Sequence, residues 1–162
     1  LQLLKRKLPR LDVDLPGEFT YKESQERTCG DQPVVVDTSL GKIGLTICYD
    51  VRFPELYRRL SEQGAEIVFV PAAFTMQTGR DHWHVLLRAR AIENQAFVIA
   101  PAQTGSKGDG LVCYGRSLII NPWGTILAQA EEGESVILAD LDFETLGSVR
   151  RKLPCLQHRK LM

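Results

Sequence analysis

The stretch that decides the fold is GKIGLTICYDVRFPEL, residues Gly41 to Leu56. Ile43, Leu45 and Ile47 alternate with small or polar residues, which is the two-residue periodicity of a half-buried strand. A cysteine and a dense polar cluster follow at once, and Pro54 fits the first turn of a helix, where its missing N–H costs nothing. The sequence therefore predicts a strand, a turn that carries a thiol, and a helix.

The thiol of Cys48 is a candidate nucleophile. Backbone N–H groups of a turn and the start of a helix both favour a thiolate and can stabilise an oxyanion. The alternative is a buried structural cysteine, because cysteine is among the most buried residue types. Asp50, Arg52 and Glu55 favour the first interpretation, since an arginine between two carboxylates can form a charge-assisted network that fixes a turn. We interpret these three residues as the scaffold of a site.

Strands and helices interleave along the rest of the chain. The helix after Pro54 ends near Gly64, and further helices are predicted at about 81–94, with Thr78 or Asp81 as start signals, and at 143–152. Asn121-Pro122-Trp123-Gly124 has the composition of a type I turn and predicts a hairpin. Residues 1–40 look irregular apart from 34–37. The pattern predicts an α/β protein with a mixed sheet, whose strands are 34–37, 43–47, 66–71, 96–101, 117–121, 125–129 and 136–141.

Composition narrows the class of protein. The chain has 162 residues, enough for one domain, and 20 basic residues balance 20 acidic ones. Nothing indicates a nucleic-acid partner, and no apolar run approaches the about 20 residues of a membrane helix. The widely spaced cysteines predict free thiols in a reducing compartment. The N-terminus is not a signal peptide and lacks Met, so we expect a start within a longer protein or a processed chain. The basic residues 150–152, Arg159 and Lys160 predict a solvated surface or a contact with an anion or a partner.

Four motifs carry a resemblance to a known family. They read ICYDVRFPELYRRL, HWHVLLRARAIENQAFVIAPAQTG, YGRSLIINPWGTILA and LPCLQHRK. In this order they resemble the nitrilase, or carbon–nitrogen hydrolase, superfamily, in the amidase branch that includes deaminated-glutathione amidase and omega-amidase. The resemblance extends from about Lys7 to Lys160. It implies a four-layer αββα sandwich, of which residues 1–162 would be the C-terminal portion.

The resemblance also implies a Glu–Lys–Cys triad with a second glutamate nearby. The cysteine falls on Cys48, and alignment on DVDLPG places the lysine on Lys7. The second glutamate falls on Glu23, with no insertion or deletion between these three positions. Two neighbours depart from the family pattern, because Lys5 and Pro9 replace a tyrosine and a histidine.

The family's general base is the first glutamate, and no residue of this sequence matches it. Glu18 and Glu26 are close in sequence to Glu23 but fit no such motif. The resemblance therefore leaves a choice between two readings. One is an amidase, and the other is a catalytically incomplete fragment or an interaction half, with a bare sheet edge that invites association.

The chemistry implied is acyl transfer through a thioester, in which the Cys48 thiolate attacks a carboxamide carbon. Lys7 and the backbone N–H of Tyr49 would hold the oxyanion, and Glu23 would position the substrate or Lys7. Phe53, Phe74 and Thr75 would line the pocket or simply pack. The substrate would be a small linear carboxylic acid with a terminal amide.

No cofactor or metal is required by this chemistry. His82 and His84 form an HxH pair, but on a helix this spacing points the two rings apart. Cys113 and Cys155 are interpreted as packing or surface thiols. By resemblance we expect a homo-oligomer with contacts at 53–63 and 153–159. The expected location is the cytosol, with an organelle as the alternative.

Overall fold

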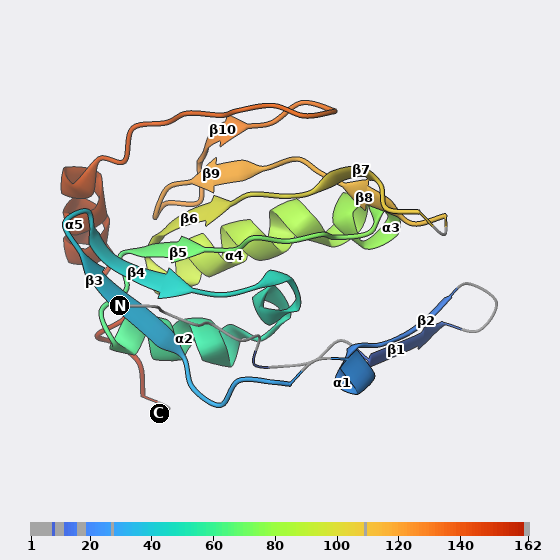
Figure 1. The fold of residues 1–162 in the computed structure, drawn as a ribbon. Coiled ribbons are helices and arrows are strands. Elements are labelled where there is room, and N and C mark those ends of the chain that lie inside the picture. The colour runs from blue at the N-terminus through green and yellow to red at the C-terminus, as the bar shows by residue number, and fades with distance from the viewer. Residues whose placement is uncertain (1–7, 9–11, 16–18, 27, 109, 161–162) are drawn as a thin grey trace.

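The computed structural model describes residues 8, 12–15, 19–26, 28–108 and 110–160. Within these residues, six strands form the main sheet in the order β10-β9-β6-β5-β4-β3 (Figure 1). β4, β5 and β6 are parallel, whereas β3, β9 and β10 pair antiparallel with their neighbours. The strands are β3 (Val34–Thr38), β4 (Gly41–Leu45), β5 (Ile67–Phe69), β6 (Phe97–Ala100), β9 (Leu118–Ile120) and β10 (Ile126–Gln129).

Helices connect the parallel strands and cover the sheet. α2 (Pro54–Glu62) leads from β4 to β5, and α4 (His84–Asn94) leads from β5 to β6. Figure 1 shows α2 and α4 side by side on one face of the sheet, with α5 at one end. The other helical segments are α1 (Glu23–Glu26), the 3₁₀ helix η1 (Cys48–Arg52), α3 (Met76–Thr78), the π-helix η2 (Gly79–Trp83) and α5 (Phe143–Lys152).

This connectivity gathers three strand ends at one edge. Parallel strands joined by crossover helices have their carboxyl ends on the same side of the sheet, where α/β proteins place their sites. η1 follows β4 and α3 follows β5 at this edge. The thiol-bearing turn therefore lies where the topology favours a functional site.

The sheet face under α2 and α4 carries the larger core. Val68, Val98 and Ile120 point from the strands toward Leu60 and Leu87 of the helices, and each is at most 2% exposed. Gly44 of β4 allows this close approach. A Cβ at that position would lie only 3.2 Å from a methyl carbon of Leu60.

The opposite face is packed by α5 only in part. Ile67, Phe97 and Leu146 form a small buried cluster there. Beside it lies an open groove of about 590 Å³, whose lining residues are Ser39, Leu40, Gly41, Ile43, Glu66, Ile67, Phe69, Ile99, Leu141 and Phe143. Arg150 fastens α5, because its Nη2 donates to the Ala65 carbonyl at 3.0 Å and its Nε to the Gln95 carbonyl at 3.1 Å. Burial lowers the pKa of Arg150.

Two small hairpins were not predicted, and the first of them corrects the prediction that residues 1–40 are irregular apart from 34–37. β1 (Asp12–Leu15) pairs antiparallel with β2 (Phe19–Lys22), and Figure 1 shows this hairpin projecting from the main sheet. β7 (Thr104–Ser106) and β8 (Val112–Tyr114) form the second hairpin, which the sequence analysis missed. Both are short, so neither leaves a clear alternation in the sequence.

Two other predictions are wrong: the strand at 136–141 and the start residue of the helix at about 81–94, a helix that is itself confirmed. Residues 136–141 form no strand; the Val136 and Leu138 side chains are each 87% exposed, so their alternation with polar residues does not mark a buried face. The helix at 81–94 begins as α4 at His84 and is preceded by η2. Thr75, rather than Thr78 or Asp81, is the capping residue of this region, since its hydroxyl accepts a bond from the Thr78 N–H.

The remaining elements are confirmed. α2 begins at Pro54, and Gly64 follows its end with a φ of +88°. The hairpin of β9 and β10 closes through a bond from the Gly124 N–H to the Asn121 carbonyl at 2.9 Å. Among the described helices, none is long and apolar enough to cross a membrane.

Candidate active site

Cys48 begins η1 in a strained conformation. After β4 the chain continues beside β5, because the Thr46 N–H donates to Phe69 and the Cys48 N–H donates to Pro71, at 3.0 and 2.8 Å. Cys48 then adopts a φ of +48°. A non-glycine residue in this region costs about 1–3 kcal/mol, so its surroundings must impose it. The residue is half-buried and packs against the larger core cluster.

Asp50 fixes the turn from inside. Its carboxylate is fully buried, and Oδ2 accepts a bond from the Ile47 N–H at 2.9 Å. Oδ1 accepts from the Leu8 N–H at 3.2 Å. This second bond brings a residue 42 positions earlier in the chain to the thiol-bearing turn. Lys7, the predicted triad lysine, lies outside the described residues, as do the predicted Lys5, Pro9 and Glu18 positions.

Arg52 lies among aromatic rings rather than between carboxylates. Its guanidinium carbon is 5.9 Å from the Tyr49 ring centroid and 5.1 Å from that of Phe74. Its Nη1 is 3.3 Å from Nδ1 of His82. Glu55 is exposed in the first turn of α2, and within the described chain it makes no ion pair with Arg52. The expected link from Arg52 to Glu55 is therefore wrong, because Arg52 turns toward the rings.

The predicted pocket residues come together from two strand ends. The rings of Tyr49 and Phe53 are in edge contact, with their centroids 5.3 Å apart. Arg52 links Phe74 to Tyr49, because its guanidinium contacts both rings. Phe74 is also a packing residue, since it is 7% exposed and lies 4.9 Å from the Trp83 ring. Thr75 is half-buried, and its hydroxyl is engaged as the cap of α3.

The two histidines of the HxH pair have different partners. His82 contacts Arg52, whereas Nε2 of His84 is 3.0 Å from the side-chain oxygen of Gln129. In the described part of the chain, no group of three or more His, Cys, Asp or Glu side chains could hold a metal ion. Trp83 lies between the histidines, is fully buried, and donates its Nε1–H to the Arg116 carbonyl at 2.8 Å.

Glu23 and the cysteines complete the set of candidate residues. Glu23 begins α1 and is half-buried; Figure 1 shows α1 beside the β1–β2 hairpin, which projects from the main sheet. The side chain of Glu26 is outside the described atoms. All four cysteines are free: Cys29 is exposed, Cys113 is buried, and Cys48 and Cys155 are half-buried.

A polar network behind the turn was missed. Arg90 falls on the buried face of α4 and is 6% exposed, and its partners are Val51, Glu93 and Tyr57. Tyr57 in turn bonds Thr46 through its hydroxyl at 3.0 Å. Burial raises the pKa of Tyr57, so its hydroxyl stays protonated. The signal in the sequence was an arginine at an apolar position of a helix.

Comparison with known proteins gives one consistent family. Residues 4–151 match the family described as Carbon-nitrogen hydrolase. A deaminated glutathione amidase from Synechocystis sp. (strain PCC 6803) is 52% identical over 155 residues, which are 94% of this chain and 57% of the relative. The chain therefore spans little more than half the length of this curated relative.

Solved structures give the same result. The nitrilase and fragile histidine triad fusion protein NitFhit of Caenorhabditis elegans matches with a TM-score of 0.89 at 42% identity, over 95% of this chain and 38% of that one. An amidase from Nesterenkonia sp. AN1, with acrylamide added at its active-site cysteine, matches with a TM-score of 0.69 at 31% identity, over 90% and 56%. The predicted α/β class and nitrilase-like fold are confirmed.

Proposed function

Because the chain belongs to the carbon–nitrogen hydrolase family, we propose that it supplies the nucleophilic half of a cysteine-dependent amidase site. One observation carries the proposal: Cys48 starts a 3₁₀ turn at the carboxyl end of a central strand, half-buried and with a φ of +48°. Strain of this kind is typical of functional positions. The amidase names and titles of the relatives and neighbours support the same reaction class.

The reaction we propose passes through a thioester. The Cys48 sulfur forms a bond to the amide carbon while a carboxylate takes the thiol proton. Lys7 and the Tyr49 N–H would hold the oxyanion, with Glu23 positioning the substrate or Lys7. Collapse breaks the carbon–nitrogen bond as the protonated carboxyl group returns the proton to the leaving nitrogen, which departs as the free amine, ammonia for a terminal amide. Water then gives a proton to the carboxylate and cleaves the thioester, and the proton passes to the sulfur, so the acid and the free thiol result. This sequence of steps uses no metal or cofactor.

Arg52 supports a substrate that carries a carboxylate. Arg52 ends the turn that Cys48 begins, and its guanidinium lies against the rings of Tyr49 and Phe74; no described carboxylate pairs with it. A planar guanidinium is well suited to bind a carboxylate through two hydrogen bonds. We propose that the substrate is a small linear acid with an amide at its far end; the deaminated glutathione named for the relatives is also a linear acid, with its cleavable amide bonded to cysteinylglycine.

We also propose that the chain forms a homo-oligomer, and a contact between two segments of the chain supports this proposal. Arg159 donates to Glu62 at 2.9 Å, so the two segments expected at the contact, 53–63 and 153–159, lie side by side.

The alternative function is an interaction half that needs a further polypeptide segment for turnover. The open groove on the second sheet face supports this alternative.

Release of the leaving amine tests the proposal. The purified chain is incubated with deaminated glutathione, which would release cysteinylglycine, and with α-ketoglutaramate and a neutral primary amide of similar length, which would release ammonia, alongside Cys48→Ala as the control. We expect release from the carboxylate-bearing amides that Cys48→Ala abolishes, because the nucleophile is removed. Cys29→Ala should leave the rate unchanged. Absence of release from a chain that is shown to be folded would favour the interaction half.

A further inference from the structure

We propose that Arg90 is a positioning residue that holds the Cys48 turn in its strained conformation. The inference rests on the proposed function insofar as Cys48 is the nucleophile. Arg90 is on α4, a helix that contributes none of the predicted site residues, and acts through the backbone of η1. Its contacts in the described chain are with Val51, Glu93, Asn94 and Tyr57, and none is with the thiol.

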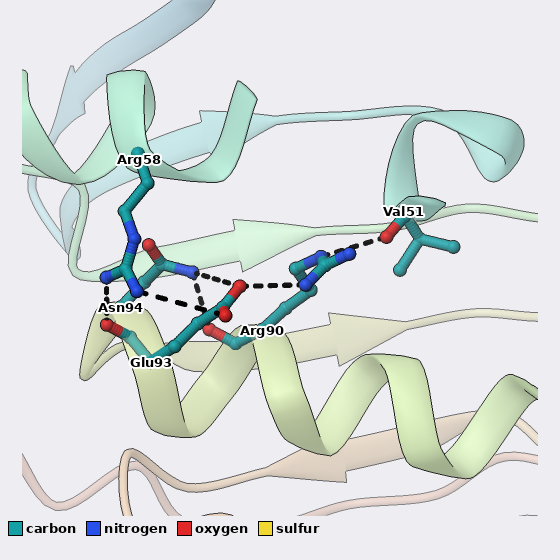
Figure 2. Close-up of polar contacts among 5 residues, drawn as sticks. All are labelled: Val51, Arg58, Arg90, Glu93 and Asn94. Atoms are coloured by element: carbon teal, nitrogen blue, oxygen red, sulfur yellow. Dashed lines mark hydrogen bonds and ion pairs between the residues drawn. The ribbon is translucent and has the colours of Figure 1, made fainter. Parts of the chain in front are cut away.

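The central contact is a buried hydrogen bond. Nε of Arg90 donates to the carbonyl oxygen of Val51 at 2.9 Å. Val51 is three residues after Cys48 in η1 and is fully buried. Figure 2 shows the Arg90 guanidinium reaching from α4 to this carbonyl at the turn. Because a 3₁₀ turn leaves its last carbonyls without helical partners, the bond satisfies a group that would otherwise be orphaned.

Burial of an arginine side chain at position 90 is energetically costly. Burying a charge between two helices costs several kcal/mol unless the charge is paired and hydrogen-bonded, and an apolar side chain would pack there at a lower cost. Arg90 meets that requirement through Glu93, whose Oε1 accepts from Nη1 at 2.8 Å. An apolar side chain could not donate a hydrogen bond to the Val51 carbonyl. The contact with η1 is therefore the specific contribution of the arginine.

The turn is held on both sides by one connected cluster. Before Cys48, the Thr46 hydroxyl donates to the Phe69 carbonyl at 2.8 Å and shares a bond with the Tyr57 hydroxyl. After Cys48, Arg90 holds Val51, and its guanidinium lies 5.4 Å from the Tyr57 ring. The positive φ of Cys48 lies between these two fixed points. Release of one point allows the backbone to relax.

Arg58 provides a matched control within the same network. Figure 2 shows it approaching Glu93 from α2, where Nη1 donates to the Glu93 carbonyl and Nη2 is 3.8 Å from Oε2. Asn94 completes the network with bonds to Arg90 and Glu93. None of the contacts of Arg58 reaches η1 in the described chain. Its loss should weaken the packing of α2 on α4 without moving the thiol.

The test measures the reactivity of Cys48 in the whole chain. Alkylation by iodoacetamide is followed by peptide mass spectrometry from about pH 6 to pH 9, with exposed Cys29 as the internal reference. For Arg90→Met we expect the rate constant of Cys48 to fall by about tenfold or more, because a relaxed backbone would move the thiol away from the N–H groups of the turn that favour the reactive thiolate. Arg90→Lys should recover part of the rate. Arg58→Met should leave it within about twofold.

An unchanged or faster rate in a folded Arg90→Met chain would overturn the proposal, as would an equal loss in Arg58→Met. If Arg90→Met does not fold, Arg90→Lys takes its place, because lysine keeps the charge but cannot hydrogen-bond Val51 and Glu93 with the same geometry. The rate constant of Cys48 in folded Arg90→Lys should then lie below that of the parent chain. The readout does not require amide hydrolysis. Slow alkylation in an Arg90 variant would support positioning even if the parent chain released no ammonia, so the two proposals fail separately.

Discussion

The two faces of the main sheet are built from alternate residues of the same strands, yet they are packed very differently. On β5 and β6, Val68 and Val98 are buried under α2 and α4, whereas their neighbours Phe69 and Ile99 line the open groove and are only half-buried. The helices of the packed face also carry the Tyr57 and Arg90 contacts to the thiol-bearing turn. Rigidity is therefore concentrated on the face that supports the candidate site.

Truncation of a leucine on the packed face should give the largest effect on stability. Leu60 is fully buried between α2 and the sheet, so Leu60→Ala leaves a cavity that its neighbours cannot fill. We expect a loss of about 2–5 kcal/mol in the free energy of unfolding. Urea denaturation of the whole chain measures it. A loss below about 1 kcal/mol would mean that this face is not tightly packed.

The same substitution beside the groove sharpens the comparison. Leu141 packs against the Ile67, Phe97 and Leu146 cluster but is only half-buried. Leu141→Ala should cost about 1 kcal/mol, because less apolar surface is removed and solvent already reaches the site. The measurement is the same denaturation curve as for Leu60→Ala. If the two substitutions cost the same, the two faces do not differ in packing.

The smallest expected effect concerns the cap of α5 and depends on pH. The Asp142 carboxylate accepts bonds from the Thr145 hydroxyl at 2.6 Å and the Glu144 N–H at 2.9 Å, and chiefly the Thr145 bond lowers the pKa of Asp142 below its ordinary 3.8. A lowered folded-state pKa means that the contribution is fully present above the unfolded value and is lost as pH falls through the folded one.

Asp142→Ala should therefore lower the urea midpoint at neutral pH and have little effect in strong acid. Asp140→Ala is the control, because it removes a carboxylate two residues earlier without removing the cap. A stability difference between Asp142→Ala and the parent chain that stayed constant from neutral pH to strong acid would show that the Asp142 carboxylate does not stabilise α5 through its charge.

The sequence predicted the central strands and helices because their periodicity is strong and local. α2 carries its own signals, Pro54 at the start and Gly64 after the end. The small hairpins were missed because strands of three or four residues show too little alternation. Residues 136–141 were misassigned because alternation alone does not show whether a partner strand exists.

The candidate site was predictable in position but not in its connections. Cys48 was placed correctly at the end of a central strand, and the motifs led to the right family. The orientation of Arg52 toward Tyr49 and Phe74 depends on which side chains meet across the edge of the sheet. The bond from Arg90 to Val51 spans 39 residues, and no local pattern in the sequence encodes a contact at that separation.

Because Cys48 has a left-handed backbone, stability and reactivity favour different residues at this one position. Glycine is the residue that adopts a φ of +48° without penalty. Backbone stability at this position would therefore favour glycine, which has no side chain that could react. A Cys48→Gly chain should be relieved of backbone strain while losing its nucleophile. Any search for more stable variants of this protein would therefore be drawn toward the substitution that destroys the proposed activity.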